Sequence, residues 1–106
     1  MAKYLWKVSY TVDGAKGLVA DGGSSRRATV EKLLNAMGGE LESFYFSLGE
    51  KDAYVIAELP DITDVAAISL AVAAAGGARI TSVPLLTPEQ MDAATKKTVQ
   101  YKAPGA

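Results

Sequence analysis

Hydrophobic and polar side chains alternate along the first segment of the chain, residues 3–12. Apolar and aromatic residues recur at every second position: Tyr4, Trp6, Val8, Tyr10 and Val12. A period of two, filled with residue types that favour strands, predicts a β-strand that Asp13-Gly14 ends. A short helical turn is expected over residues 15–20, before a break at residues 21–23.

The next segment has the period of a one-sided helix. Its apolar residues follow the i, i+3, i+4, i+7 spacing: Val30, Leu33, Leu34 and Met37. Ser24 and Ser25 are predicted to cap the start of this helix, which runs to Met37. The glycine pair at positions 38–39 is expected to end it with a left-handed residue.

Two strands joined by a short connection are predicted next. The first covers residues 40–48, and the second covers residues 53–59 after a connection of hairpin length. Strict alternation divides the first of these strands into two faces: Phe44 and Phe46 on one side, Leu41 and Tyr45 on the other.

The rest of the chain repeats the order of the first half. Pro60-Asp61 opens an alanine-rich helix that the glycine pair at positions 76–77 ends, and a fourth strand is predicted over residues 78–86. The helix has an apolar stripe: Val65, Ile68, Val72 and Ala75. Residues 87–90, Thr-Pro-Glu-Gln, form a capping box with proline at the first helical position, which predicts a third helix.

Strand, helix, glycine pair and strand therefore occur twice, with a hairpin between the copies. This order predicts an α+β fold, a ferredoxin-like β-α-β-β-α-β antiparallel sheet with an extra C-terminal helix. Residues 1–106 are interpreted as one domain, with a core at 1–86 and the C-terminal helix and tail at 87–106.

Both faces of the predicted sheet carry apolar side chains. In the third strand these are Val55, Ala57 and Leu59 on one side, with Tyr54 and Ile56 on the other. Two helices cover only one face of a four-stranded sheet, and soluble monomers seldom expose the other face when it is apolar. The C-terminal helix would cover part of it, and a second sheet packed face to face would cover more. We therefore expect a homodimer or a larger assembly.

The amino-acid composition limits the kinds of catalysis and metal binding that are open to the protein. The chain has no cysteine and no histidine, which excludes thiolate nucleophiles, disulfides, histidine-ligated metals and histidine-based catalytic relays. No metal site and no cofactor are predicted. Catalysis would fall to Asp, Glu, Lys, Arg, Tyr, Ser or Thr, or to a bound cofactor.

The net charge and the hydropathy of the chain limit its expected binding partners and its expected location in the cell. Eleven basic and twelve acidic residues give a net charge of −1, so no electropositive field is present to gather nucleic acid or an anionic membrane. The third strand offers only Tyr54 for base stacking, which excludes an RNA recognition motif of the same topology. No secretory signal or membrane-spanning run is evident, and the expected location is the cytoplasm.

Several short motifs together resemble the GYD domain family. In the first half they are Lys16-Gly17-Leu18, Gly22-Gly23, Arg26-Arg27 and Val30-Glu31-Lys32-Leu33. In the second half they are Leu41-Glu42-Ser43-Phe44-Tyr45-Phe46 and Glu58-Leu59-Pro60-Asp61. The resemblance covers nearly the whole chain. One departure concerns the family's namesake stretch of glycine, any residue, an aromatic and aspartate, because Lys51 stands here in place of the aromatic.

The resemblance implies a dimeric α+β barrel, in which two ferredoxin-like sheets pack against each other. The resemblance does not imply any particular reaction, because none is assigned to the family. Relatives of the broader fold include cofactor-free monooxygenases, lactone isomerases, haem-degrading enzymes and amino-acid-sensing modules, and fold analogy does not choose among them.

Two clusters of polar residues are candidates for a site. Arg26 and Arg27 lie at the start of the first long helix, where free N–H groups favour an anion and two positive charges oppose the helix dipole. Either a ligand carboxylate or phosphate compensates them, or Asp21 or Asp52 does. In one interpretation Gly49 and Asp52 are turn residues, and glycine allows a positive φ. In the other, Asp52 is an acid or base and the candidate catalytic residue.

The predicted ligand-binding residues are Tyr10, Arg27, Tyr45, Asp52 and Tyr54. The leading hypothesis is a homodimeric module that binds a small organic molecule, with the tyrosines lining the cavity and Arg27 and Asp52 as polar anchors. Packing in the core or the dimer interface is the alternative role for the tyrosines. The alternative functions are a cofactor-independent monooxygenase or isomerase acting on a small aromatic or lactone-like substrate, and a structural or interaction protein without a pocket.

Overall fold

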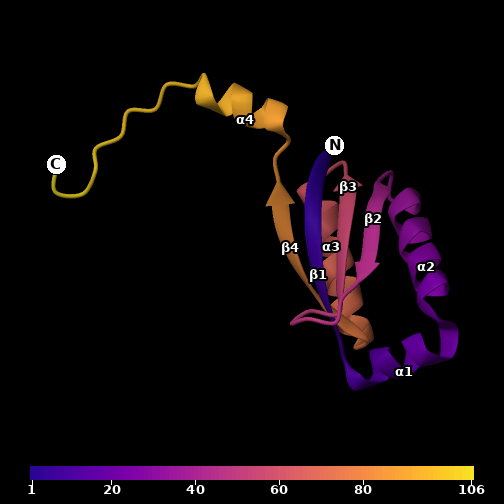
Figure 1. Cartoon of the computed structure of the whole chain (residues 1–106). Coiled ribbons are helices and arrows are strands. Elements are labelled where there is room, and N and C mark those ends of the chain that lie inside the picture. Colours follow the sequence, from indigo (N-terminus) through magenta and orange to yellow (C-terminus); the bar gives the residue numbers. More distant parts are fainter.

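The computed structural model describes residues 1–106 and contains eight elements (Figure 1). In chain order they are β1 (Ala2–Tyr10), α1 (Val12–Asp21), α2 (Gly23–Ala36), β2 (Glu40–Phe46), β3 (Ala53–Leu59), α3 (Ile62–Ala75), β4 (Ala78–Leu85) and α4 (Pro88–Thr95). The four strands form one antiparallel sheet in the order β2-β3-β1-β4. The predicted α+β, ferredoxin-like fold is confirmed.

The core lies between one face of the sheet and the helices α2 and α3. Every second residue of β3, beginning with Ala53 and ending with Leu59, is buried, and the aromatic side chains of Tyr4 and Trp6 in β1 are buried beside them. Leu34 from α2 and Val65 and Ile68 from α3 belong to the same cluster. The buried cluster is entirely apolar, so the removal of apolar surface from water is its main source of stability.

Three helix ends form as their sequence signals indicate. Asp61 caps α3 through a capping box with Asp64, and Gly76 ends that helix in the left-handed conformation. Thr87 caps α4 through a capping box with Gln90, and Pro88 is the first residue of α4. Local side-chain chemistry is sufficient to determine these boundaries.

The first strand ends earlier than its alternation predicts. Strand β1 stops at Tyr10, because the Thr11 hydroxyl accepts a hydrogen bond from the Gly14 N–H (3.2 Å) and caps α1. The same hydroxyl donates to the Gly76 carbonyl oxygen (2.7 Å), and the Thr11 N–H donates to the Gly77 carbonyl oxygen (3.0 Å). The predicted strand to residue 12 was therefore wrong at its end, and the short turn is a helix of ten residues.

The predicted serine cap of α2 is also wrong. Gly22, with φ of 83°, separates α1 from α2, and α2 begins at Gly23 with no side-chain cap. A positive φ of this kind is accessible to glycine at no steric cost. The first turn of α2 also contains no acidic residue.

A β-bulge corrects the predicted faces of β2. The register shifts between Leu41 and Ser43, so Leu41 lies opposite Ala57 and Phe44 lies opposite Val55. Leu41 and Phe44 therefore share the helix-covered face, and only Tyr45 of the predicted pair points to the other face. A bulge inserts one residue and so reverses the alternation beyond it.

The other face of the sheet is not covered by this chain. Leu5 of β1 lies between Ile56 of β3 and Val83 of β4 and forms an apolar row across three strands. Helix α4 has no buried residue, and Figure 1 shows α4 and the C-terminal tail extending away from the sheet. The two edge strands have irregular features, because β2 contains the bulge and β4 contains Pro84.

A matched pair of glycines in α1 tests how this helix is held. A Cβ atom on Gly14 would overlap the carbonyl group of Gly77, whereas a Cβ on Gly17 would meet nothing within 4 Å. Gly14→Ala is expected to lower the free energy of unfolding by about 1–3 kcal/mol through overpacking. Gly17→Ala is expected to raise it by roughly 0.5–1 kcal/mol, because alanine loses less backbone entropy in a helix.

Urea denaturation followed by circular dichroism measures both effects. The two variants carry the same chemical change three residues apart, so a general effect of alanine on helix propensity would move them in the same direction. Equal stabilisation of both proteins would contradict the close approach of α1 to Gly77.

Candidate functional site

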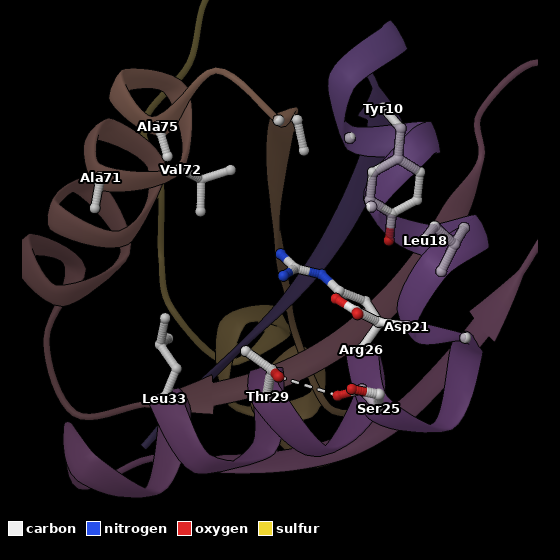
Figure 2. Close-up of a pocket in the computed structure, with 15 residues that line it drawn as sticks. Tyr10, Leu18, Asp21, Ser25, Arg26, Thr29, Leu33, Ala71, Val72 and Ala75 are labelled. Carbon is white, nitrogen blue, oxygen red and sulfur yellow. Dashed lines mark hydrogen bonds between the residues drawn. The ribbon is translucent and has the colours of Figure 1, made fainter.

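A cavity of about 410 Å³ lies where α1, α2 and α3 meet the ends of β1 and β4 (Figure 2). Its volume falls within the range of roughly 300–1,000 Å³ that is common for small-molecule sites. Small residues of α1, of α3 and of the connection after α3 leave the space open: Gly14, Gly17, Ala71, Ala75 and Gly77. The alanine-rich sequence of α3 therefore supplies a wall that does not fill the cavity.

The cavity has an apolar side and a polar side. Leu33, Val72 and the alanines of α3 lie on one side in Figure 2, and polar side chains from the first turns of α2 lie on the other. The polar side includes Ser25 and Thr29, whose hydroxyl donates to the Ser25 carbonyl oxygen at 3.0 Å. Such a lining suits a molecule with one charged or polar end and an apolar body.

Arg26 supplies the positive charge of the cavity. Its side chain is half-buried among the lining residues, and Figure 2 shows the guanidinium group directed into the space between the helices. The only ion pairs in the structure are those of Lys3 with Glu42 (3.1 Å) and Glu58 (3.7 Å). Arg26 therefore has no carboxylate partner, although Asp21 lines the same cavity.

Tyr10 places a phenol group next to this guanidinium. Burial raises the pKa of the Tyr10 phenol above its ordinary value. The charge and hydrogen bonding of Arg26 oppose that increase in pKa, and the negative charge of Asp52 adds to it. The phenol is therefore protonated at neutral pH and can donate a hydrogen bond to a ligand oxygen.

The five residues proposed from the sequence lie in four separate places. Tyr10 lines the cavity. Asp52 accepts a hydrogen bond from the Tyr10 N–H (2.8 Å) but is not a lining residue, and Arg27 is exposed. Tyr45 and Tyr54 lie opposite each other on the uncovered face of the sheet, away from the cavity.

Hydrogen bonds tie the 49–52 connection to β1. The Asp52 carboxylate holds the Tyr10 N–H, and the Asp52 N–H donates to the Val8 carbonyl oxygen at 2.9 Å. Both bonds fasten the connection to β1, which agrees with the interpretation of Asp52 as a turn residue. Gly49 does not have the positive φ that was predicted for it. Its N–H donates to the Ser47 hydroxyl (3.1 Å).

The sequence analysis proposed Arg27 as the ligand-binding arginine, but the structure places Arg26 in the cavity. Helical periodicity contains the signal that separates the two. Arg26 precedes Val30 and Leu33 by four and seven residues, so it continues the inward stripe of α2, whereas Arg27 is turned away by about 100°. The part of the lining that α1 contributes, such as Leu18, has no comparable signal in the sequence.

A comparison with protein families agrees with this fold. The model of the GYD domain matches residues 4–95 of the 106-residue chain. The chain belongs to the GYD domain family. No curated protein and no solved structure matches the chain.

Neither a cluster of metal-ligating residues nor a membrane-spanning helix is found in this GYD domain protein. No group of three or more Asp and Glu residues is placed to hold a metal ion, in agreement with the lack of histidine and cysteine. None of its helices combines the length and the apolar character that crossing a membrane requires. The cavity around Arg26 is therefore the main concave feature to which a function can be assigned.

The pKa of Tyr10 provides a test of the cavity's electrostatics. Arg26→Gln removes the positive charge that lowers this pKa, so the pKa of Tyr10 is expected to rise further. Arg27→Gln removes the same charge from an exposed neighbouring position and is expected to leave the pKa unchanged. NMR titration of ¹³C-labelled tyrosine, with Tyr10→Phe to assign the resonance, measures it. Equal shifts in the two glutamine variants would show that Tyr10 responds only to net charge.

Proposed function

We propose that this GYD domain protein is a homodimeric module that binds a small organic anion in the cavity around Arg26. The observation that carries the proposal is the unpaired guanidinium of Arg26, half-buried in a cavity of ligand size. A partly buried charge without a partner is costly, and a ligand carboxylate would offset that cost with two parallel hydrogen bonds.

The surroundings of Arg26 favour an anion with an organic body over a bare inorganic ion. The hydroxyl groups of Tyr10 and Ser25 line the same cavity and offer further donors to an oxygen ligand. Leu33 and Val72 provide apolar surface for a hydrocarbon part. The uncapped start of α2, which lies beside the cavity, contributes a favourable electrostatic field for a negative group.

The homodimer is proposed because of the uncovered face of the sheet. The row Ile56–Leu5–Val83 is flanked by Tyr45 and Tyr54, which gives a contiguous apolar surface. On that face Lys3 pairs with two glutamates, whereas Lys7, opposite Tyr54, has no ion pair. A second copy of the same face would bury the apolar row.

The catalytic alternative draws no support from the position of Asp52. Both hydrogen bonds described for this residue go to the backbone of β1, and its side chain is not among those lining the cavity. An acid or base must come within hydrogen-bond reach of its substrate. Binding without turnover is therefore the better-supported function.

Arg26 and its exposed neighbour provide the test of ligand binding. Isothermal titration with pentanoate is expected to show binding to the unmodified protein and to Arg27→Gln. Binding to Arg26→Gln is expected to be weaker by roughly 10- to 100-fold, because a charge-assisted hydrogen bond of about 1.5–3 kcal/mol is lost. Asp21→Asn is expected to strengthen binding, since it removes a competing carboxylate from the cavity.

Pentanamide, which has the same shape without the charge, is the ligand control and is expected not to bind measurably. Equal affinity of the two glutamine variants for pentanoate would contradict a role for Arg26.

Native mass spectrometry with analytical ultracentrifugation tests the assembly. The unmodified protein is expected to be a dimer, and Ile56→Glu is expected to convert it to a monomer by placing a charge at the centre of the apolar row. Leu70→Glu changes an exposed leucine on α3 and is expected to leave the dimer intact. A monomeric unmodified protein would refute the dimer without affecting the cavity.

A further inference from the structure

A second, smaller space adjoins the cavity around Arg26. This inner pocket has a volume of about 100 Å³ and lies between the helix-covered face of the sheet and the helices α2 and α3. Six residues line both spaces: Tyr10, Arg26, Thr29, Leu33, Val72 and Ala78. Arg26, the proposed anion-binding residue, therefore lies where the two spaces meet.

The inner pocket is lined almost entirely by hydrophobic side chains. They account for eleven of its thirteen lining residues, and the other two, Arg26 and Thr29, also line the larger cavity. The Thr29 hydroxyl donates its proton to the Ser25 carbonyl oxygen at 3.0 Å and so has none to offer a ligand. A buried water molecule needs two to four polar partners, and apolar cavities stay dry. The lining therefore suits a hydrocarbon group better than water.

The two spaces suit opposite ends of one ligand. The larger cavity is more polar, with Asp21, Ser25 and Arg26 among its lining residues, so a carboxylate bound there keeps polar partners. A tail that extends from Arg26 into the inner pocket leaves water for an apolar lining, which is favourable for a hydrocarbon and costly for an unpaired polar group. The tail is therefore expected to carry no hydroxyl, keto or amino group.

The volume of the inner pocket limits the length and the shape of that tail. A water molecule occupies roughly 30 Å³ of the liquid, and a methylene group is of similar size, so about three carbon atoms fit in the 100 Å³ of the pocket. A cavity of roughly 150 Å³ accommodates benzene, which makes the inner pocket too small for an aromatic ring.

We infer that the inner pocket is the subsite for the tail of a short aliphatic carboxylate that has no polar substituent. The carboxylate binds Arg26 in the larger cavity, and the last carbon atoms of the chain occupy the inner pocket. This inference rests on the proposed function, because it names the chemical class of the anion at the same site.

NMR spectroscopy of the full chain with ¹³C-labelled isoleucine methyl groups locates the tail directly. Ile68 and Ile80 line the inner pocket and not the larger cavity, whereas Ile62 is exposed on α3. Pentanoate is expected to shift the methyl resonances of Ile68 and Ile80 and to leave that of Ile62 in place. 3-Phenylpropanoate, whose ring is too large for the inner pocket, is expected to shift neither. Shifts as large as those caused by pentanoate would overturn the aliphatic class.

Isothermal titration with acids of increasing length measures the contribution of the tail. Affinity is expected to rise by about fourfold for each methylene group from propanoate through butanoate to pentanoate, because each one moves from water into the apolar pocket. The control is 4-hydroxybutanoate, which has the length of pentanoate with a hydroxyl in place of the terminal methyl group. It is expected to bind roughly tenfold more weakly than pentanoate, and equal affinity would contradict an apolar tail.

Two variants distinguish the inner pocket from the larger cavity. Val30 lines only the inner pocket, and Ala75 lines only the larger cavity. Val30→Phe fills part of the inner pocket and is expected to abolish the gain in affinity from propanoate to pentanoate. Ala75→Leu is expected to retain that gain. The reverse result would show that the tail lies in the larger cavity and would overturn the inference.

The failure of the inference differs from the failure of the proposed function. Binding of pentanoate that leaves Ile68 and Ile80 unmoved, and that is no tighter than the binding of propanoate, overturns the inference and retains anion binding at Arg26. The absence of binding by all the acids overturns the proposed function and the inference together. Since both results come from the unmodified protein, they do not depend on whether Val30→Phe folds.

Discussion

The junction of Thr11 with the glycine pair at the end of α3 determines the form of the site. Thr11 donates from its N–H and its hydroxyl to the carbonyl oxygens of Gly77 and Gly76, and so turns the chain out of the sheet. The close approach of Gly14 to Gly77 then holds α1 across the ends of β1 and β4. Without this contact α1 would not close the cavity, and Arg26 would face solvent. Packing at the cavity therefore depends on glycines, which have no side chain.

The start of α2 combines features that oppose the stability of the helix. It has no side-chain cap and no acidic residue in its first turn, and Arg26 places a positive charge near the positive end of the helix dipole. Natural sequences are locally consistent in most places, and violations concentrate where a site is needed. These features lower the stability of the first turn of α2, and an anion bound in the cavity would raise that stability. In the proposed function, ligand binding would therefore stabilise the helix.

The fold could be predicted because its signals are local and repeated. Alternation at period two, the helical stripes and the two glycine pairs are each contained in a few neighbouring residues. The errors occurred where a distant group decides the outcome, such as the end of β1, which Thr11 sets by bonding to Gly76. The bulge at residues 41–43 likewise depends on the pairing of β2 with β3.

The site was harder to predict than the fold. Tyr10 lines the cavity, whereas Tyr45 and Tyr54, which the sequence analysis grouped with it, lie on the other face of the sheet. Which side of a sheet a strand residue occupies depends on register, and register is a tertiary property. Arg26 could have been preferred over Arg27 from helical periodicity alone. The contribution of α1 to the lining depends on the path of the chain after Thr11, which no local pattern encodes.

Pro84 and the bulge in β2 have a consequence for how copies of the chain can meet. An exposed strand edge can recruit another strand and extend a sheet without limit. Proline lacks the N–H that such pairing requires on β4, and the bulge distorts the ladder on β2. Growth by edge-to-edge addition, the geometry of fibrils, is thus obstructed at both ends of the sheet. The proposed homodimer would instead join the two apolar faces in a closed pair, which leaves no such surface for a third copy.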